Sequence, residues 1–186
     1  MEAVSKKERL VTAASELFHQ HGIGQTSIAQ IAERADVPLG NVYYYFKTKE
    51  ELALEVMKER KNYIISFCRE LDETQGNPQD RLISVLRFYD KIREDFAKYG
   101  CPIGCIVQES KSSEDVVAKA AANYFSEFLN WSERQFASMG HARKSRDLAV
   151  SFLARIQGIG VVAKAFGDSK LISHEIKELE DWVRRL

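Results

Sequence analysis

The chain has 186 residues, which leaves room for a small recognition domain and a second hydrophobic core. Its 27 basic and 27 acidic side chains balance to zero, which argues against a protein that coats nucleic acid but not against one that binds a specific site through local basic groups. The N-terminus is charged, and we expect no run of the roughly 18 apolar residues that span a bilayer, so the sequence predicts a cytoplasmic protein with no membrane association.

Helical spacing of apolar residues predicts a first helix close to the N-terminus. Its apolar positions are Leu10, Ala13, Ala14, Leu17 and Phe18. A second helix is expected to begin at Ser27, because Ser27 and Gln30 have the spacing of a capping box. Pro38 follows closely, and a proline disfavours helical dihedrals at the residue before it. The break between the second helix and the next is therefore only about three residues long.

A short third helix is expected over residues 39–46. It lies between the proline break and a second capping box, at Thr48 and Glu51, that opens another helix. Two turns of helix are not stable alone, so this helix must be held by its neighbours. We expect Val42 and Phe46 to pack on the preceding helices, which leaves the opposite face of the short helix exposed.

Two helices joined by a tight turn, with a polar outer face, are typical of a helix-turn-helix DNA-binding unit. Gly40 would let the backbone approach a base edge, Asn41 would hydrogen-bond one, and tyrosine hydroxyls would donate to phosphates. The expected DNA-contacting residues are Thr26, Ser27, Leu39, Gly40, Asn41, Tyr43, Tyr44, Lys47 and Lys49. The alternative for the same pattern is a three-helix packing unit with a solvated polar face.

This segment resembles the DNA-binding domain of the tetracycline-repressor (TetR) family. The matching positions are Ala13, Ala14, Phe18, Gly22, Thr26, Ile31, Ala32, Val37, Gly40, Val42, Tyr43, Phe46, Lys49 and Leu52. The resemblance implies that Tyr43, Tyr44 and Lys49 lie at phosphates, and that the start of the short helix, at Leu39, lies nearest the bases. It also implies repression of a near-palindromic operator. Asp36 stands where the family usually has a turn glycine.

The rest of the chain reads as helices throughout, so the sequence predicts an all-α fold of about nine helices. We expect a helix-turn-helix domain over residues 1–49 and a helical effector-binding and dimerisation domain over residues 50–186. After the first three helices, the expected helical segments are 48–71, 78–99, a short helix within 101–110, 113–140, 142–166 and 173–186. Asn77 caps the second of these segments, and Ser113 begins the fourth.

Two glycines within an apolar helix, Gly158 and Gly160, predict a close helix crossing, because glycine inside a helix costs about 1 kcal/mol relative to alanine. The resemblance implies a homodimer held by the two C-terminal helices of each chain. The candidate interface residues are Ile156, Ile159, Gly160, Leu179, Trp182 and Val183. Such a dimer would place two recognition helices about 34 Å apart. The alternative is that the glycines serve packing within one subunit.

Aromatic residues are dense on the inward stripes of the second part, and the resemblance implies a small-molecule effector there. The candidate pocket residues are Tyr63, Phe67, Phe88, Tyr89, Tyr124, Phe128, Trp131 and Phe152, with Cys101, Gln108, Asn123 and Gln157 as polar partners. Few charges fall on these stripes, so a largely apolar or aromatic effector is favoured over an anionic one. The alternative is that the rings form only a hydrophobic core.

The three cysteines and four histidines predict neither a metal site nor a catalytic one. An odd cysteine count argues against structural disulfides, and no histidine completes a metal set or a nucleophile pair, so we expect no cofactor and no enzyme. Cys101 and Cys105 lie four residues apart ahead of a helix, which leaves a thiol-based oxidant or electrophile sensor as an alternative. A helical adaptor that binds other proteins is the alternative from another functional class.

Overall fold

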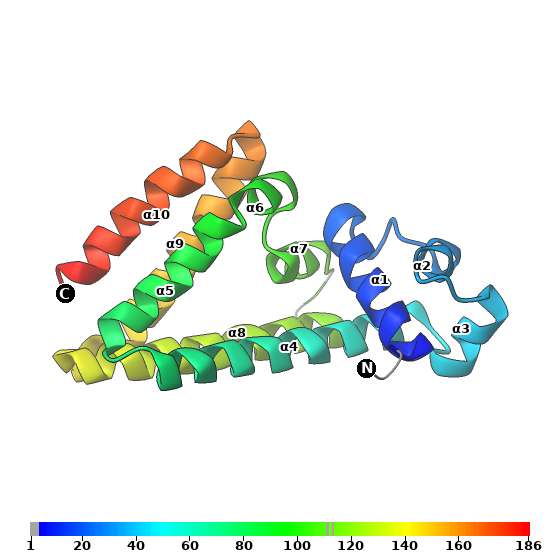
Figure 1. Cartoon of the computed structure of the whole chain (residues 1–186), viewed down its shortest axis with the longest axis horizontal. Coiled ribbons are helices and arrows are strands. Elements are labelled where there is room, and N and C mark those ends of the chain that lie inside the picture. The colour runs from blue at the N-terminus through cyan, green and yellow to red at the C-terminus, as the bar shows by residue number, and fades with distance from the viewer. Residues whose placement is uncertain (1–3, 111, 113) are drawn as a thin grey trace. The chain divides into compact units, whose positions relative to one another are not determined.

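The computed structural model describes residues 4–110, 112 and 114–186, and all the regular structure in them is helical. These residues contain ten α-helices, which confirms the predicted all-α fold of about nine helices (Figure 1). Contacts divide the chain into two compact units. Unit 1 comprises Met1–Asn62 and Pro102–Tyr124, and unit 2 comprises Tyr63–Cys101 and Phe125–Leu186. The boundary expected after residue 49 falls inside unit 1 and stays a prediction.

Unit 1 begins with three short helices, labelled α1 to α3 in Figure 1. They are α1 (Lys6–His21), α2 (Ile28–Arg34) and α3 (Leu39–Tyr45). The predicted capping box at Ser27 is present, because the Ser27 hydroxyl accepts from the Gln30 N–H and the Gln30 side chain accepts from the Ser27 N–H. Val42 is fully buried, as expected for a helix that cannot stand alone.

Unit 1 also contains α7 (Pro102–Glu109) and the first parts of the long helices α4 (Lys49–Thr74) and α8 (Val116–Phe136). The Thr48 hydroxyl accepts from the Glu51 N–H at 3.0 Å and so caps α4. The Glu51 carboxylate instead accepts from the Lys47 N–H, one residue before the expected partner. The carboxylate of Asp115 caps α8, and Ser113, the predicted start of that helix, lies outside the described residues.

Unit 2 is built on the packing of α5 (Pro78–Lys91), α6 (Arg93–Tyr99), α9 (Ser145–Phe166) and α10 (Ser169–Arg184). Figure 1 shows α5, α9 and α10 running alongside one another. Asn77 caps α5, as predicted. A π-helical turn (Ala137–His141) and a 3-10 turn (Ala142–Lys144) join α8 to α9, and Gly140 provides the required positive φ of 94°.

Two helix boundaries in unit 2 differ from the predictions. The helix expected over residues 78–99 is interrupted at Ile92, whose ψ of 18° departs from helical geometry without any glycine or proline to announce the break. The last helix starts four residues before the predicted Ser173, because the Asp168 carboxylate accepts from the Lys170 N–H and caps α10 there.

One helical stretch in the described residues, Val116–Phe166, is long and apolar enough to cross a membrane by length and composition, because it contains an 18-residue window with a mean hydropathy of 1.4. The expectation that no such stretch exists is therefore wrong. Core helices of soluble proteins pass the same test, and here 33% of the apolar window is buried. The length of this stretch also includes the bend at Gly140, and its apolar character comes partly from exposed valines on α9, such as Val161 and Val162.

Candidate functional site

The short helix α3 has a buried face and an exposed face of very different character. Val42 is fully buried and Phe46 is 5% exposed, and both belong to the same core as Ile31 of α2. On the other face, Tyr44 is 78% exposed and Tyr43 49% exposed. Exposed aromatic rings cost free energy in water, so this face has the composition of a contact surface.

The first turn of α3 is open enough for close approach by a ligand. Leu39 is exposed, and a Cβ placed on Gly40 would meet nothing within 4 Å. The protein itself therefore does not require glycine at this position. Asn41 is half-buried, and its backbone N–H donates to the Pro38 carbonyl at 2.8 Å. This bond does not use the side-chain amide, which can still bind an outside partner.

The turn between α2 and α3 depends on an unusual backbone conformation at Asp36. Its φ is +51°, the left-handed region that favours glycine, and Asp36 is the described non-glycine residue with positive φ. The Asp36 carboxylate pairs with the Arg9 guanidinium at 3.1 Å. An aspartate therefore fills a turn position for which glycine is the simpler choice.

Two of the predicted DNA-contacting residues point into their own chain. The Thr26 side chain is 2% exposed, and its hydroxyl donates to the Gly22 carbonyl at 2.7 Å. The Lys49 ammonium donates to the carbonyls of Ile23 at 2.6 Å and of Thr26 at 2.8 Å. In this structure these groups satisfy the backbone of the loop between α1 and α2, and their expected contacts with DNA stay predictions.

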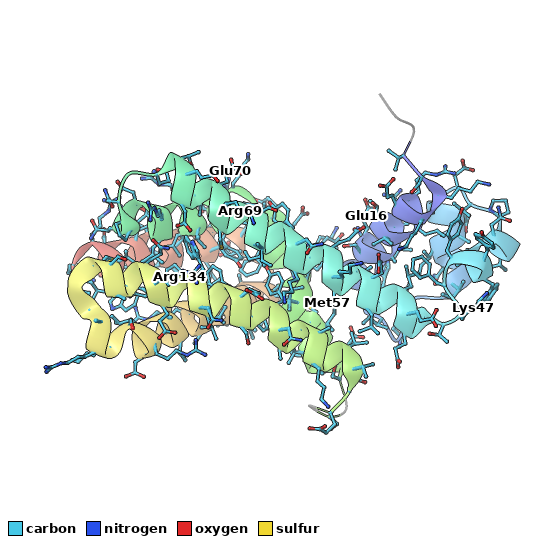
Figure 2. All side chains as sticks on the ribbon, turned by 90° about the horizontal axis from the view of Figure 1, so that it is seen from below. Glu16, Lys47, Met57, Arg69, Glu70 and Arg134 are labelled. Atoms are coloured by element: carbon cyan, nitrogen blue, oxygen red, sulfur yellow. The ribbon has the colours of Figure 1, made fainter. Side chains whose placement is uncertain are left out.

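Ser27 and Lys47 remain at the surface. Ser27 is exposed at the start of α2 while its hydroxyl caps that helix. The Lys47 ammonium donates to the Tyr43 carbonyl at 2.7 Å, at the end of α3 (Figure 2). The charge of Lys47 therefore lies beside the exposed tyrosines. These residues, with Leu39, Gly40 and Asn41, form the surface that we name the α3 face.

Aromatic rings in unit 2 form a continuous ladder across α4, α5 and α6. Successive ring centroids lie 6.3 Å apart from Tyr63 to Phe67, 5.3 Å from Phe67 to Phe88, 5.7 Å from Phe88 to Tyr89, and 5.0 Å from Tyr89 to Phe96. Phe96 is buried, but the other four rings are half-buried or exposed. A ladder of partly exposed rings can stack against an apolar or aromatic ligand.

The remaining predicted pocket residues do not join this ladder. Phe128, Trp131 and Phe152 are buried in a second aromatic cluster, in which the Phe128 ring lies 6.2 Å from the Phe152 ring. These three rings are buried in the single chain, and their place in an effector pocket stays a prediction. Gln108 and Asn123 are exposed, whereas Tyr124 and Cys101 are half-buried.

Gln157 on α9 has a buried amide nitrogen with no hydrogen-bond partner among the described residues. It lies one turn before Gly160, at which an added Cβ would come within 2.6 Å of the Phe96 ring. The unpaired donor therefore lies near the buried end of the aromatic ladder. Such a group costs about 1 to 3 kcal/mol unless a ligand or water accepts from it.

The predicted dimer residues divide between the core and the surface. Ile156, Gly160 and Val183 are buried within unit 2, and Gly160 serves close packing within the chain, as the alternative held. Ile159 and Leu179 are buried in the single chain but line a surface cavity of about 420 Å³, and Trp182 is half-buried with the Arg155 guanidinium 4.7 Å above its ring.

An apolar stripe on α9, on a different side from the core residues, is exposed. Its members recur at helical spacing, and they are Val150, Ala154, Gly158, Val161, Val162 and Ala165. A Cβ on Gly158 would meet nothing within 4 Å, so this glycine has no packing role within the described part of the chain. We name this surface the α9 stripe. In the sequence, this stripe could have been predicted from the helical spacing of the valines, and not from the isoleucines, which are buried.

The cysteines are all free thiols in the structure. Burial, with a smaller contribution from the Asp72 carboxylate, raises the pKa of the Cys68 thiol to about 12, so it stays protonated and unreactive at neutral pH. Cys101 and Cys105 are half-buried, and the thiol-sensor alternative stays a prediction. In the described residues no three His, Cys, Asp or Glu side chains gather as a metal site would require.

Two known protein families match separate parts of the chain. Residues 10–56 match bacterial regulatory proteins of the tetR family, and residues 83–177 match the C-terminal domain of LmrA/YxaF-like transcriptional regulators. The second match covers slightly more than half of the 186 residues. The first spans the helices that carry the α3 face.

Relatives and solved structures agree with both matches. The chain is 24% identical over 184 residues to the HTH-type transcriptional regulator LmrA of Bacillus subtilis, covering 96% of this chain and 97% of that one. It is 26% identical over 101 residues to the HTH-type transcriptional repressor NemR of Escherichia coli, covering 54% of this chain and 49% of that one. Its fold resembles a TetR transcriptional regulator from Legionella pneumophila, with a TM-score of 0.84 at 19% identity over 97% of this chain and 98% of that one.

Proposed function

Because the chain belongs to the tetR family of bacterial transcriptional regulators, we propose that it represses transcription from a near-palindromic operator and leaves it when a small effector binds. The α3 face enters the major groove, with Tyr43 and Tyr44 against the phosphate backbone and Asn41 at a base edge. This role places the chain in the cytoplasm. The observation that carries the proposal is the pair of tyrosines held outward by the buried Val42 and Phe46.

Selection of bound fragments from genomic DNA, followed by footprinting, tests this role. We expect specific binding to exceed binding to random DNA by roughly 10³-fold or more. Tyr43→Ala and Tyr44→Ala should weaken binding to every sequence, whereas Asn41→Ala should change discrimination between sequences. Lys144→Ala, at an exposed position in unit 2, serves as the control. Equal affinity for random and selected DNA would instead favour a helical adaptor.

The aromatic ladder supports an effector that is largely apolar or aromatic. Such a molecule would stack on Phe67 and Phe88, whose rings are half-buried, and would offer a hydrogen-bond acceptor to the unpaired Gln157 amide. Native mass spectrometry of the purified chain tests this directly. A co-purified compound that is lost in Phe88→Ala but kept in Phe125→Ala would support the ladder, and an equal loss in both would not.

The α9 stripe supports a homodimer in which α9 and α10 pack against their copies. Val162 and Phe166 are 49% and 77% exposed, and Gly158 would allow two helices to approach closely. Beside the stripe, Arg155, Glu175 and Glu178 line the cavity of about 420 Å³. A two-fold axis at this cavity would let each chain's arginine meet the other's acids, and it would present two α3 faces to a palindrome.

A further inference from the structure

A second cavity, of about 250 Å³, lies between the later part of α4 and α8 in unit 2. Its apolar lining consists of Ile64, Ile65, Cys68 and the Trp131 indole. Figure 2 shows these two helices side by side, with Arg69 on α4 and Arg134 on α8. Both arginines line the cavity, one from each helix. The cavity therefore combines an apolar interior with two guanidinium groups.

These guanidinium groups have few partners of their own. Arg69 is exposed and has no hydrogen bond or ion pair within the part of the chain that the structure describes. Among the described residues, Arg134 makes one long hydrogen bond, from Nη1 to the Asn130 carbonyl at 3.3 Å. Arginine presents its donors in a planar fork that matches a carboxylate, so two such groups beside one cavity can bind an anion.

Asp72, one of the two carboxylates that line the cavity, is hydrogen-bonded and ion-paired to groups other than these arginines. Asp72 accepts from the Trp131 indole N–H at 3.1 Å and from the Gln135 amide at 3.2 Å, and it pairs with Arg81 at 3.5 Å. Glu127, the other carboxylate of the lining, has an interaction of its own. The Cys68 thiol stays protonated at neutral pH, since burial raises its pKa to about 12, so this group adds no negative charge to the cavity.

We propose that this cavity binds a small monocarboxylate whose body is an aromatic ring or a short alkyl chain. The carboxylate meets Arg69 and Arg134 at the rim, and the body lies against Ile64, Cys68 and the Trp131 indole. The site uses a different face of α4 from the one that carries the aromatic ladder, because Ile64, Cys68 and Asp72 recur four residues apart on a stripe that does not include Tyr63 or Phe67. It therefore goes beyond the proposed effector site and does not depend on DNA binding.

Calorimetric titration of the full chain with sodium benzoate and sodium octanoate tests the site, with benzamide and octanamide as uncharged controls. We expect one carboxylate per chain to bind and neither amide to bind. Arg69→Gln should weaken binding by roughly tenfold to a hundredfold, the effect of losing one hydrogen bond to a charged group. Arg143→Gln, at an exposed position outside the cavity, should bind as the natural chain does.

Fluorescence locates the bound molecule. In a Trp182→Phe background the remaining tryptophan is Trp131, so carboxylate binding should change its emission, and Arg69→Gln should abolish that change. The proposal is overturned if the amides bind as tightly as the acids, if inorganic phosphate binds as tightly as benzoate, or if Arg69→Gln has no effect. A chain that binds the carboxylate but no operator would leave this site standing and remove the proposed repressor role.

Discussion

The Lys49 ammonium closes a loop of its own chain. It donates hydrogen bonds to the carbonyls of Ile23 and Thr26, and the Lys49 side chain is half-buried there. We predict that Lys49→Gln lowers the free energy of unfolding by about 1.5 to 3 kcal/mol, the range for hydrogen bonds to a charged group. Urea denaturation measures this loss.

The salt dependence of DNA binding separates this role from a phosphate contact. Losing one phosphate contact lowers the slope of log affinity against log salt by about one. We expect that drop for Lys47→Gln, whose charge lies at the α3 face, and no change in slope for Lys49→Gln. A lower slope in Lys49→Gln but not in Lys47→Gln, together with unchanged stability in Lys49→Gln, would indicate that Lys49 contacts a phosphate.

The unpaired amide of Gln157 should lower the free energy of unfolding of the ligand-free chain. Its buried nitrogen has lost water without gaining a partner among the described residues. We predict that Gln157→Leu raises the unfolding free energy by about 1 kcal/mol, with Gln108→Leu at an exposed position as the control. A loss of stability in Gln157→Leu would show that the amide is already satisfied, by an ordered water for example.

The Cys68 thiol should make stability fall at alkaline pH. Its pKa rises from about 8.5 in an unfolded chain to about 12 in the fold, because burial disfavours the thiolate. The neutral thiol therefore contributes stability that is fully present below about pH 8.5 and is lost as pH rises toward 12. Between pH 8 and 10 we expect the natural chain to lose more stability than Cys68→Ala. Parallel pH profiles for the two chains would contradict this.

At the scale of elements, the local signals in the sequence determine most of unit 1. Capping boxes, the proline break and the buried Val42 predicted α2 and α3 within a residue or two, because these are contacts between near neighbours in the chain. The break at Ile92 was missed, since no residue type marks it. The hydrogen bonds that Thr26 and Lys49 make within the chain were not predicted, because their partners are loop carbonyls, which any sequence can supply.

The loop between α1 and α2 also depends on α7. The Glu109 carboxylate accepts from the Gly24 N–H at 3.2 Å, and it occupies the space where a Cβ on Gly22 would lie, 2.1 Å from Oε1. Gly22 has φ 86° and ψ 159°, a conformation that is essentially restricted to glycine. The backbone conformation therefore requires glycine at this position, and a Cβ there would also displace the Glu109 carboxylate.

We predict that Gly22→Ala destabilises the chain by about 1 to 3 kcal/mol, while Gly24→Ala, whose Cβ would lie at an ordinary 3.9 Å, has a much smaller effect. Thermal unfolding of the two variants tests this difference. In a Glu109→Ala background, Gly22→Ala should cost less, because only the backbone strain remains. An identical cost in both backgrounds would mean that the carboxylate moves aside freely.

At the scale of the whole molecule, periodicity in the sequence predicted an all-α chain but not which face of each helix meets another chain. Isoleucines at helical spacing look the same whether they pack within one subunit or between two. Ile156 belongs to the internal core, whereas the exposed members of the α9 stripe are small residues and valines with weaker hydrophobic signals. Assigning the faces required knowing that α5 and α6 already cover one side of the C-terminal pair.

The α9 stripe makes a specific prediction about assembly. Val162→Glu places a charge on a surface that would be buried between two chains, and an unpaired buried charge is strongly destabilising to an interface. We expect this variant to elute with the mass of one chain in size-exclusion chromatography with light scattering, where the natural chain has twice that mass. Val107→Glu, at a valine of similar exposure on α7, should remain dimeric.

Operator binding should fall together with the dimer. Two recognition helices on one scaffold gain affinity because the second contact is intramolecular, and losing that linkage costs roughly 10²-fold or more. Val162→Glu should therefore protect no two-fold symmetric site at concentrations at which Val107→Glu still does, although its α3 face is unchanged. If Val162→Glu is monomeric and still protects both half-sites, DNA binding does not require the dimer. If Val162→Glu is dimeric, the dimer interface lies on a surface other than the α9 stripe.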